Sequence, residues 1–447
     1  MTNDTQFRIR ELTDRSARRV LLATGVLSLV VFVATLLLPR SDGHLVGSDG
    51  RSYYAILRSV VFDGNLDLAN EYAWIGFDPK PLTRMGLPEC PFAIGTSVLW
   101  FPFFAAAHLL SLLLRGIGAS VPADGLGMIY EASVCIGTIA YGTAGLLLTY
   151  GAVRRISPPH ISLLSTMGMF AATPAIYYMV AEPSMSHIPS LFAVALFLRL
   201  WYPPRPNRGV WAWIGLGAVT GLVTLVRWQN AILVVIPFAE LAYFAFHHEI
   251  SVTRAITALA LLVVASLLVF SPQSLMWLVI YGSPITMPQG GNFSQWFAPQ
   301  PVAALFSRRH GLFLWHPMFA VALTGLATLW KRDRTLAGVV LAVFCAQLYI
   351  NSSAVAWWAH DAYGGRRFTG TIPLLTTALA TLLQKTQRRQ RFYCGVLVVM
   401  CLLAAWNGMG AIQFVFSFVS RGDGLTWREL TIDRLLVPLK LLRQLSG

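Results

Sequence analysis

The stretch Gly47–Tyr72, GSDGRSYYAILRSVVFDGNLDLANEY, is the most polar and most acidic part of the N-terminal half of the chain. It follows the first long apolar run, and Asp49 lies near its beginning. Most of the remaining sequence consists of apolar runs, whereas this stretch carries several ionisable side chains. It is therefore the first place in the chain where a functional site is expected.

The composition predicts an all-α protein that crosses a membrane many times. Of the 447 residues, 55% are hydrophobic and only 12% are charged, about half the charged share of a soluble domain. Apolar runs of roughly 17 to 28 residues recur along the chain, and each is long enough to cross a hydrocarbon core.

The net charge of +14 does not indicate a nucleic-acid partner. The basic residues are spread over short loops between apolar runs, as the positive-inside rule requires of cytoplasmic loops. The five cysteines have no close spacing, which argues against a disulfide framework and against a zinc site.

The long segment 39–127 is expected outside the membrane. An arginine cluster in residues 1–19 predicts a cytoplasmic N-terminus, so the first span, 20–38, runs outward. The apolar run 93–114 allows two topologies. If it crosses, Arg154 and Arg155 fall outside and every later basic loop inverts, so we favour a re-entrant or interfacial helix there.

With 93–114 not crossing, about eleven helices span the membrane and the tail 416–447 lies outside, with an interfacial helix over 430–445. The expected spans are 20–38, 128–151, 160–180, 186–202, 210–226, 230–246, 254–281, 314–330, 335–355, 370–384 and 392–415.

Apolar residues at helical spacing in Ser52–Val61 predict a short amphipathic helix on the membrane surface. Asp63, Gly64 and Asn65 are expected to end it as a turn. Asp63 and Asp67 are therefore read as turn formers.

On this topology the ionisable and polar residues at membrane depth gather on the outer face, where such residues are costly and usually functional. Arginine clusters bind phosphate through charge-assisted bonds, and a nearby carboxylate can act as a general base. Together they suggest a phosphate-linked donor and a hydroxyl or amine acceptor. The residues are Asp49, Glu182, His187, Arg227, Gln289, Arg308, Arg309, His310, His360, Asp361, Arg366 and Arg367.

The first-loop pattern SDGRSYYAILRSVVFDGN, with Asp49, Tyr53, Tyr54 and Arg58, resembles that of the GT-C glycosyltransferases. These include the protein O-mannosyltransferases and the aminoarabinose transferase of lipid A. The turn LVRW around Arg227 resembles their Leu-Thr-Lys-Gly turn. The stretches EPSMSHIPSLFAVALFL, LFSRRHGLFLWHP and AYGGRRFTGTIPLL look like those of an uncharacterised bacterial subgroup.

The resemblance implies an inverting transferase of the inner (plasma) membrane with an extracytoplasmic site in the catalytic module 20–281, followed by 282–415. A polyprenyl-phosphate-linked sugar would be the donor, Asp49 the general base, and a glycan, lipid or protein the acceptor. Lys80, in Asp78-Pro79-Lys80-Pro81, would join the phosphate-binding arginines. Some relatives bind a divalent metal ion. A divalent metal ion is therefore a possible cofactor, but no metal ligand is assigned because no His/carboxylate spacing demands one. Gly50 stands where the protein mannosyltransferases have a second acidic residue, which weakens the resemblance to that group in particular.

Each candidate also has a structural interpretation. Asp49 could cap the surface helix, and Arg227 could extend toward lipid headgroups. His187 could be a satisfied core histidine, and the pairs Arg308–Arg309 and Arg366–Arg367 could contact lipid or flank spans. The tryptophans Trp296, Trp315, Trp357 and Trp358 fit an interface belt better than sugar platforms.

Two other functional classes stay open. A transporter or flippase of lipid-linked sugars would have internal repeats and a site near the membrane midplane, and neither is evident in the sequence. A non-catalytic membrane component could keep the same fold with the Asp49 segment unused.

Overall fold

The computed structural model describes residues 13–36, 43–421 and 424–446. Within these ranges every regular element is a helix, with isolated β-bridges only between Leu82 and Pro88 and between Ser294 and Ala354. Of the predicted cytoplasmic segment 1–19, residues 1–12 lie outside the described part.

Seven helical segments are long and apolar enough to cross a membrane, and the bent pair of α6 (Pro159–Ala171) and α7 (Pro174–Val180) makes an eighth. The chain is thus a multi-pass helical membrane protein. The seven are α1 (Asp14–Thr35), α4 (Gly95–Gly116), α5 (Met128–Val153), η2–α10 (Trp228–Val234 and Val235–Phe246), α11 (Val252–Tyr281), α16 (Arg334–Ser353) and α18 (Gln390–Val415).

Two further apolar helices, α8 (His187–Trp201) and α9 (Val210–Val226), are shorter but match predicted spans closely. The shorter elements fill the loops and the tail. They are α2 (Gly50–Arg58), η1 (Ser59–Asp63), α3 (Ala69–Trp74), η3 (Gly291–Phe293), α12 (Pro301–Phe306), α19 (Trp427–Leu430), α20 (Ile432–Leu435) and α21 (Val437–Ser446).

Two predicted spans are interrupted, and a third begins two residues late. The span expected over 160–180 is α6 (Pro159–Ala171) and α7 (Pro174–Val180), bent by 72° where Thr173 caps a new helix that begins at a proline. The span over 314–330 is α13 (Leu312–Trp315), α14 (Met318–Thr324) and α15 (Leu326–Arg332). Pro317 lacks an N–H and holds His316 out of the helical region. The span over 370–384 is α17 (Ile372–Thr386), preceded by the 3₁₀ turn η4 (Arg366–Thr371).

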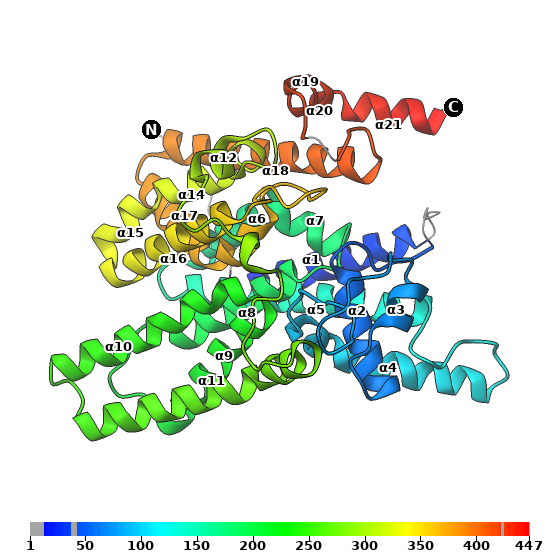
Figure 1. Cartoon of the computed structure of the whole chain (residues 1–447). Coiled ribbons are helices and arrows are strands. Elements are labelled where there is room, and N and C mark those ends of the chain that lie inside the picture. The colour runs from blue at the N-terminus through cyan, green and yellow to red at the C-terminus, as the bar shows by residue number, and fades with distance from the viewer. Residues whose placement is uncertain (1–12, 37–42, 422–423, 447) are drawn as a thin grey trace.

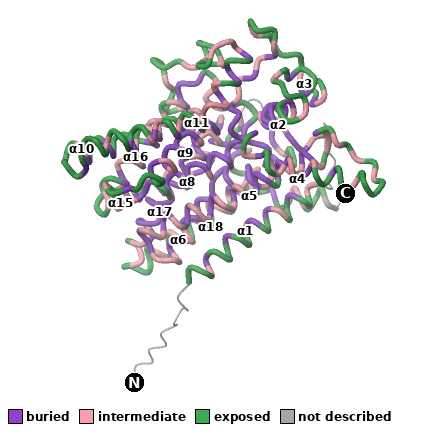
Figure 2. The backbone as a smooth tube through the Cα atoms, turned by 90° about the horizontal axis from the view of Figure 1, so that it is seen from below, coloured by how far each residue is buried: buried purple, intermediate pink, exposed green. Residues whose placement is uncertain are grey.

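The most buried helices form the middle of the bundle (Figures 1 and 2). Figure 2 shows buried backbone concentrated along α5, α8, α9 and α17, with exposed backbone along α1 and α10. Gly217 and Gly221 let α9 approach α11 closely, because a Cβ at either position would lie 2.5 Å from a backbone oxygen of α11.

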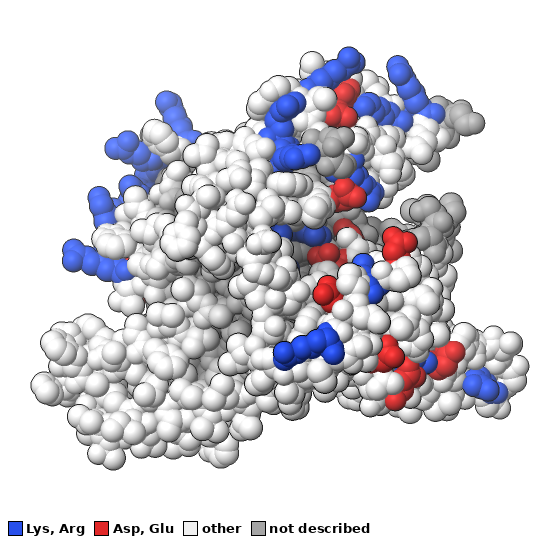
Figure 3. Space-filling model, in the orientation of Figure 1, with Lys and Arg blue, Asp and Glu red and all other residues white. Residues whose placement is uncertain are grey.

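Charged side chains are distributed unevenly over the face that Figure 3 shows. Lysines and arginines gather over the helices at the upper left and over the C-terminal helices, and acidic residues gather on the side of the first loop. The α10–α11 arm shows only uncharged atoms on this face, as expected of a surface that contacts lipid.

The helix predicted over Ser52–Val61 is present as α2 and η1, and it ends at Gly64 with a positive φ of 65°. Its predicted position on the surface is wrong, because Tyr53, Ile56 and Leu57 are buried against other parts of the protein. The helix is therefore part of the packed body and not a separate membrane-surface element.

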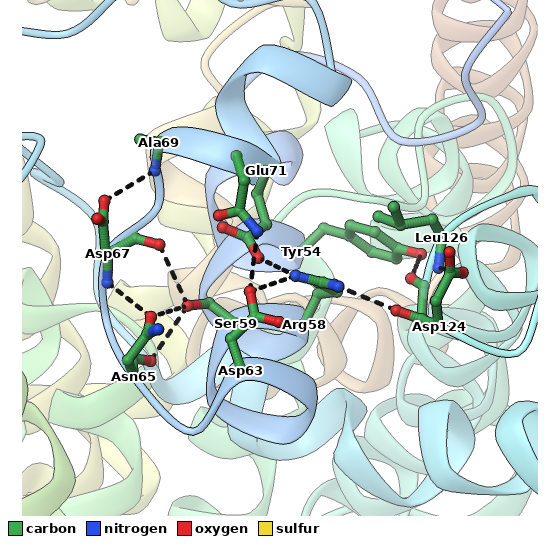
Figure 4. A network of polar contacts seen from close by, with 12 residues as sticks. Tyr54, Arg58, Ser59, Asp63, Asn65, Asp67, Ala69, Glu71, Asp124 and Leu126 are labelled. Carbon is green, nitrogen blue, oxygen red and sulfur yellow. Dashed lines mark hydrogen bonds and ion pairs between the residues drawn. The ribbon is translucent and has the colours of Figure 1, made fainter.

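An arginine at the end of α2 fixes the fold of the first loop (Figure 4). Arg58 pairs with Asp63 and with Glu71, the latter at 2.7 Å, and its Nε donates to the Asp124 carbonyl at 3.2 Å. The Asp67 carboxylate accepts from the Ala69 backbone N–H at 3.2 Å. These contacts agree with the prediction that Asp63 and Asp67 form turns.

Contacts at the two ends of α5 fix the position of α1 and of the segment that follows it. Arg154, at the end of α5, pairs with Asp14 at the start of α1, with 2.6 Å between Nε and Oδ1. Glu131, at the start of α5, accepts from the backbone N–H groups of Leu45 and Val46, which follow α1. Helices α1 and α5 are therefore antiparallel, and the segment that leads into α2 lies at the N-terminal end of α5.

Candidate active site

A cavity of about 390 Å³ opens where the first loop meets the ends of several bundle helices, within the size range of small-molecule sites. Eight of the predicted site residues line it: Asp49, Tyr53, His187, Arg227, Gln289, His360, Arg366 and Arg367. They come from α2 and the segments around it, the start of α8, the end of α9, the loop after α11 and the loop before α17.

Asp49 lies immediately before α2, and its side chain makes no capping hydrogen bond there. The interpretation of Asp49 as a helix cap is therefore wrong. Its Oδ2 instead lies 3.3 Å from Nη2 of Arg366. Gly50 permits this position, since a Cβ there would lie 2.2 Å from the Ser184 carbonyl oxygen.

Arg227 ends α9 with an extended backbone, and its side chain turns toward the start of α8. Nη1 contacts Ser186 Oγ at 2.9 Å and His187 Nδ1 at 3.0 Å, and Nη2 donates to Gln229 Oε1 at 3.1 Å. The interpretation of Arg227 as an anchor that extends to the headgroups is wrong. His187 accepts at Nδ1, which makes it a partner of Arg227 at the cavity wall.

Arg366 and Arg367 open η4, immediately before α17. Burial lowers the pKa of Arg366, but Asp49 and its other neighbours raise it more, so that it stays above its usual value. Burial, together with Arg366 and Arg227, lowers the pKa of Arg367 to about 9, which still leaves the guanidinium charged at pH 7.

The Arg367 guanidinium is unpaired within the described part of the chain. It lies over the Phe293 ring at 6.0 Å, and no hydrogen bond from its nitrogens is found among the described residues. Arg367 is partly buried, and a partly desolvated charge without hydrogen-bond acceptors is less favourable than one that is paired. A ligand with anionic oxygens would meet this need at the cavity.

A network of amide side chains, which was not predicted from the sequence, holds the turns that carry Arg227 and the Arg366–Arg367 pair. Gln229 Nε2 donates to the Arg367 carbonyl at 2.9 Å and to Gln347 Oε1 at 3.1 Å. Gln347 Nε2 donates to Asn230 Oδ1 at 3.2 Å, and Asn351 donates to Gln347 at 3.4 Å. Gln347 and Asn351, one helical turn apart in an otherwise apolar run, were the signal that could have revealed it.

Three further cavity residues have definite partners. The Tyr53 hydroxyl bonds Ser186 Oγ at 3.0 Å, and burial together with Asp49 raises the pKa of Tyr53 to about 12. Gln289 Nε2 donates to the Pro91 carbonyl at 2.7 Å. His360 is exposed and lines the cavity with a positive φ of 53°.

Glu182 lies close to the cavity without lining it. Burial and the Asp49 carboxylate raise the pKa of Glu182 to about 7, while Arg366 opposes this shift. The carboxyl group therefore changes its charge near neutral pH, next to the Asp49–Arg366 pair.

The remaining predicted site residues lie outside the cavity. Arg58 and Tyr54 hold the first loop, since the Tyr54 hydroxyl donates to the Gly125 carbonyl at 2.6 Å. The others are Lys80, 4.6 Å from the Phe77 ring; Arg308, 5.9 Å from the Trp427 ring; Arg309, 4.8 Å from the Trp358 ring; His310, whose Nδ1 lies 2.6 Å from the Trp358 carbonyl; and the exposed Asp361.

The predicted tryptophan belt also needs a correction. Trp315 is fully buried and packs against Tyr363 and Phe414, so it is a core residue. Trp296 lines the cavity. Aromatic side chains from four segments line the cavity together with the polar groups, as is usual for ligand sites; they are Tyr53, Phe92, Trp228, Phe293 and Trp296.

Three guanidinium groups, those of Arg227, Arg366 and Arg367, line the cavity together with one carboxylate, that of Asp49. This charge balance favours an anionic ligand, and the carboxylate offers one acceptor for a proton. In the described ranges no three His, Cys, Asp or Glu side chains gather as a metal site would require.

Sequence comparison finds no matching protein-family model and no matching curated protein. Similar solved structures exist. ArnT from Cupriavidus metallidurans, in the apo state, aligns with a TM-score of 0.54 at 15% identity, over 94% of this chain and 72% of ArnT.

The archaeal oligosaccharyltransferase AglB from Archaeoglobus fulgidus, in complex with an inhibitory peptide and a dolichol-phosphate, aligns with a TM-score of 0.52 at 13% identity. This match covers 92% of the chain but only 57% of AglB. The apo form of the Archaeoglobus fulgidus oligosaccharyltransferase gives 0.50. ArnT and AglB are both GT-C glycosyltransferases. The fold predicted from the sequence is therefore confirmed, and this chain has the GT-C glycosyltransferase fold.

Proposed function

We propose that the protein transfers a sugar from a polyprenyl-phosphate donor to a hydroxyl or amine acceptor at the outer face of the inner membrane. The observation that carries this proposal is the partly buried Arg367 guanidinium, unpaired among the described residues, at a cavity that also holds Arg227, Arg366 and the Asp49 carboxylate. Such a set can bind a phosphate ester and remove a proton from an acceptor in the same space.

In this proposal the arginines act on the donor phosphate. Arg227 and Arg367 would bind its oxygens, and their charge would stabilise the phosphate as it leaves the anomeric carbon. The amide network through Gln229 fixes both arginines before the donor arrives, which reduces the cost of ordering them during the reaction.

Asp49 would act on the acceptor. Its Oδ2 faces Arg366, so the pair holds the carboxylate in one orientation. The carboxylate would take the acceptor proton as the acceptor attacks the anomeric carbon from the side opposite the phosphate, which inverts the configuration.

The cavity position supports transfer over transport. Its polar groups lie at the ends of α9 and α16 and at the starts of α2, α8 and η4, whereas transporter sites lie near the midplane between broken helices of two repeats.

The test uses the purified full chain in lipid nanodiscs and a panel of polyprenyl-phosphate hexoses and pentoses, with release of polyprenyl phosphate as the readout. Asp49→Asn should lower turnover by about 10²- to 10⁴-fold and leave the affinity for polyprenyl phosphate within about threefold of wild type, a change of less than about 1 kcal/mol. Arg367→Gln should weaken that affinity by about 10- to 100-fold, because it removes a charge-assisted contact.

Asp78→Asn and Arg115→Gln provide matched controls, since both side chains are exposed and lie outside the cavity. Both should behave as wild type. Undiminished turnover in Asp49→Asn would rule out the general base, and unchanged affinity in Arg367→Gln would remove that arginine from the donor site.

A further inference from the structure

The C-terminal segment contains a buried arginine that the proposed reaction does not use. Arg434, in α20, is 0% exposed, and its Nη1 and Nη2 have no hydrogen-bond partner among the described residues. Its Nε donates to Gln413 Oε1 of α18 at 3.1 Å. Arg434 also forms no ion pair with any of the described residues.

The Arg434 guanidinium lies against two tryptophan rings and not against a carboxylate. The Arg434 guanidinium carbon lies 5.5 Å from the Trp315 ring and 4.9 Å from the Trp406 ring. Cation–π contacts are strongest when they are desolvated, as here. Gly410 leaves room for the guanidinium, because a Cβ at that position would lie 2.9 Å from its central carbon.

These contacts also connect Arg434 to the turn that carries Arg366 and Arg367 at the cavity. Trp315 packs edge-on against Tyr363 at 5.9 Å, and a Cβ at Gly410 would meet both Arg434 and the Tyr363 hydroxyl. Arg434 therefore adjoins Tyr363, which lies three residues before Arg366 and four before Arg367.

Tyr363 is held at both ends. Its backbone N–H donates to the Tyr178 hydroxyl at 2.8 Å, and its own hydroxyl donates to Asn407 at 2.7 to 2.8 Å. Immediately after it, Gly364 has a positive φ of 58° and packs on the His316 ring so closely that a Cβ would lie 1.9 Å from Nε2. The direction of the next residues, including Arg366 and Arg367, depends on this packing.

Figure 1 shows how the tail is arranged. Helices α19 to α21 lie beside the end of α18, and α18 contacts both α20 and α21. The C-terminal tail lies outside the helix bundle, and the Arg434 side chain extends from it into the interior. Gln413 also donates to the Glu429 carbonyl at 3.0 Å, which fixes the tail next to Arg434.

We propose that Arg434 is a positioning residue for the cavity, which holds the Trp315–Tyr363 contact and thereby sets the turn that carries Arg366 and Arg367. Its effect on ligand binding rests on the proposed function, whereas its effect on the turn does not.

The experiment compares Arg434→Ala and the conservative Arg434→Lys in the full chain in nanodiscs. Arg428→Ala is the matched control, because Arg428 lies in the same tail with its side chain 75% exposed. Hydrogen exchange is followed in the peptide over 359–371, and affinity is measured with farnesyl phosphate. In Arg434→Ala we expect about tenfold faster exchange at 363–368 and about tenfold weaker binding. Arg434→Lys should be intermediate, because lysine keeps the charge but not the planar group, and Arg428→Ala should match wild type.

A double variant separates this role from general destabilisation. If Arg434 acts through the arginine turn, the loss of affinity in Arg434→Ala with Arg367→Gln should be smaller than the sum of the two single losses. Unchanged exchange at 363–368, an equal rise in every peptide, or additive losses would overturn the proposal. If wild type does not bind farnesyl phosphate, that result counts against the donor site alone, and the exchange measurement still decides the role of Arg434.

Discussion

Glu182 makes the charge of the site depend on pH. Burial and the Asp49 carboxylate raise the pKa of Glu182 to about 7, so the group is mostly neutral at pH 6 and mostly negative at pH 8. An ionised Glu182 repels an anion in the cavity. The affinity for a short prenyl phosphodiester, whose phosphate does not titrate in this range, should therefore fall by about five- to tenfold from pH 6 to pH 8.

Glu182→Gln should remove most of this pH dependence and keep the higher affinity at pH 8, because the glutamine is neutral throughout. Asp361→Asn is the control, since Asp361 is exposed and lies outside the cavity lining, and it should keep the wild-type profile. A pH profile of Glu182→Gln that matches wild type would show that another group titrates.

At the scale of elements, Glu131 connects the start of α5 to the segment that leads to Asp49. It accepts from the Leu45 and Val46 backbone N–H groups and lies 2.8 Å from His44 Nδ1. Glu131→Gln replaces an acceptor-only group with one that carries an N–H₂, and it should lower the free energy of unfolding by about 1 to 3 kcal/mol. Hydrogen exchange should rise in the peptide over 43–57, whereas Asp78→Asn, an exposed acid of the same loop, should leave it unchanged. A protected 43–57 peptide in Glu131→Gln would contradict this anchoring.

The sequence predicted the helices well because long apolar runs are a strong signal. It singled out Asp49, Arg227 and the 366–367 pair, which line the cavity, because ionisable residues at membrane depth are rare and usually functional. It could not separate Arg308–Arg309 from Arg366–Arg367, since both are arginine pairs next to a span. The difference depends on tertiary packing: Gly364 fits against His316 and turns the second pair toward the cavity. The bend in 160–180 was missed because Thr173–Pro174 was read inside an apolar run.

At the scale of the whole molecule, the structure gives an argument on topology that does not depend on loop charge. Helix α4 is long enough to cross a membrane, yet the chain before and after it lies at one end of α5. Before α4, Leu45 and Val46 bond Glu131 at the start of α5. After α4, the chain enters α5 at Met128, and the Gly125 carbonyl accepts from Tyr54 of α2.

Helix α4 should therefore make no net crossing, which membrane-impermeant maleimide labelling of single cysteines can check in a variant without the five native cysteines. Ser120→Cys, in the exposed loop after α4, should react from the same side as Asp78→Cys before it, and Lys331→Cys should react only once the membrane is opened. The reason is that α1 and α5 cross in opposite directions, with Asp14 and Arg154 at one face and 45–46 and Glu131 at the other. If α4 crossed the membrane, α5 would have to begin at the face where Asp14 lies. In the structure, α5 ends at that face. Labelling of Ser120→Cys from the side of Lys331→Cys would mean that α4 crosses, and it would move Arg154 and Arg155 to the outer face.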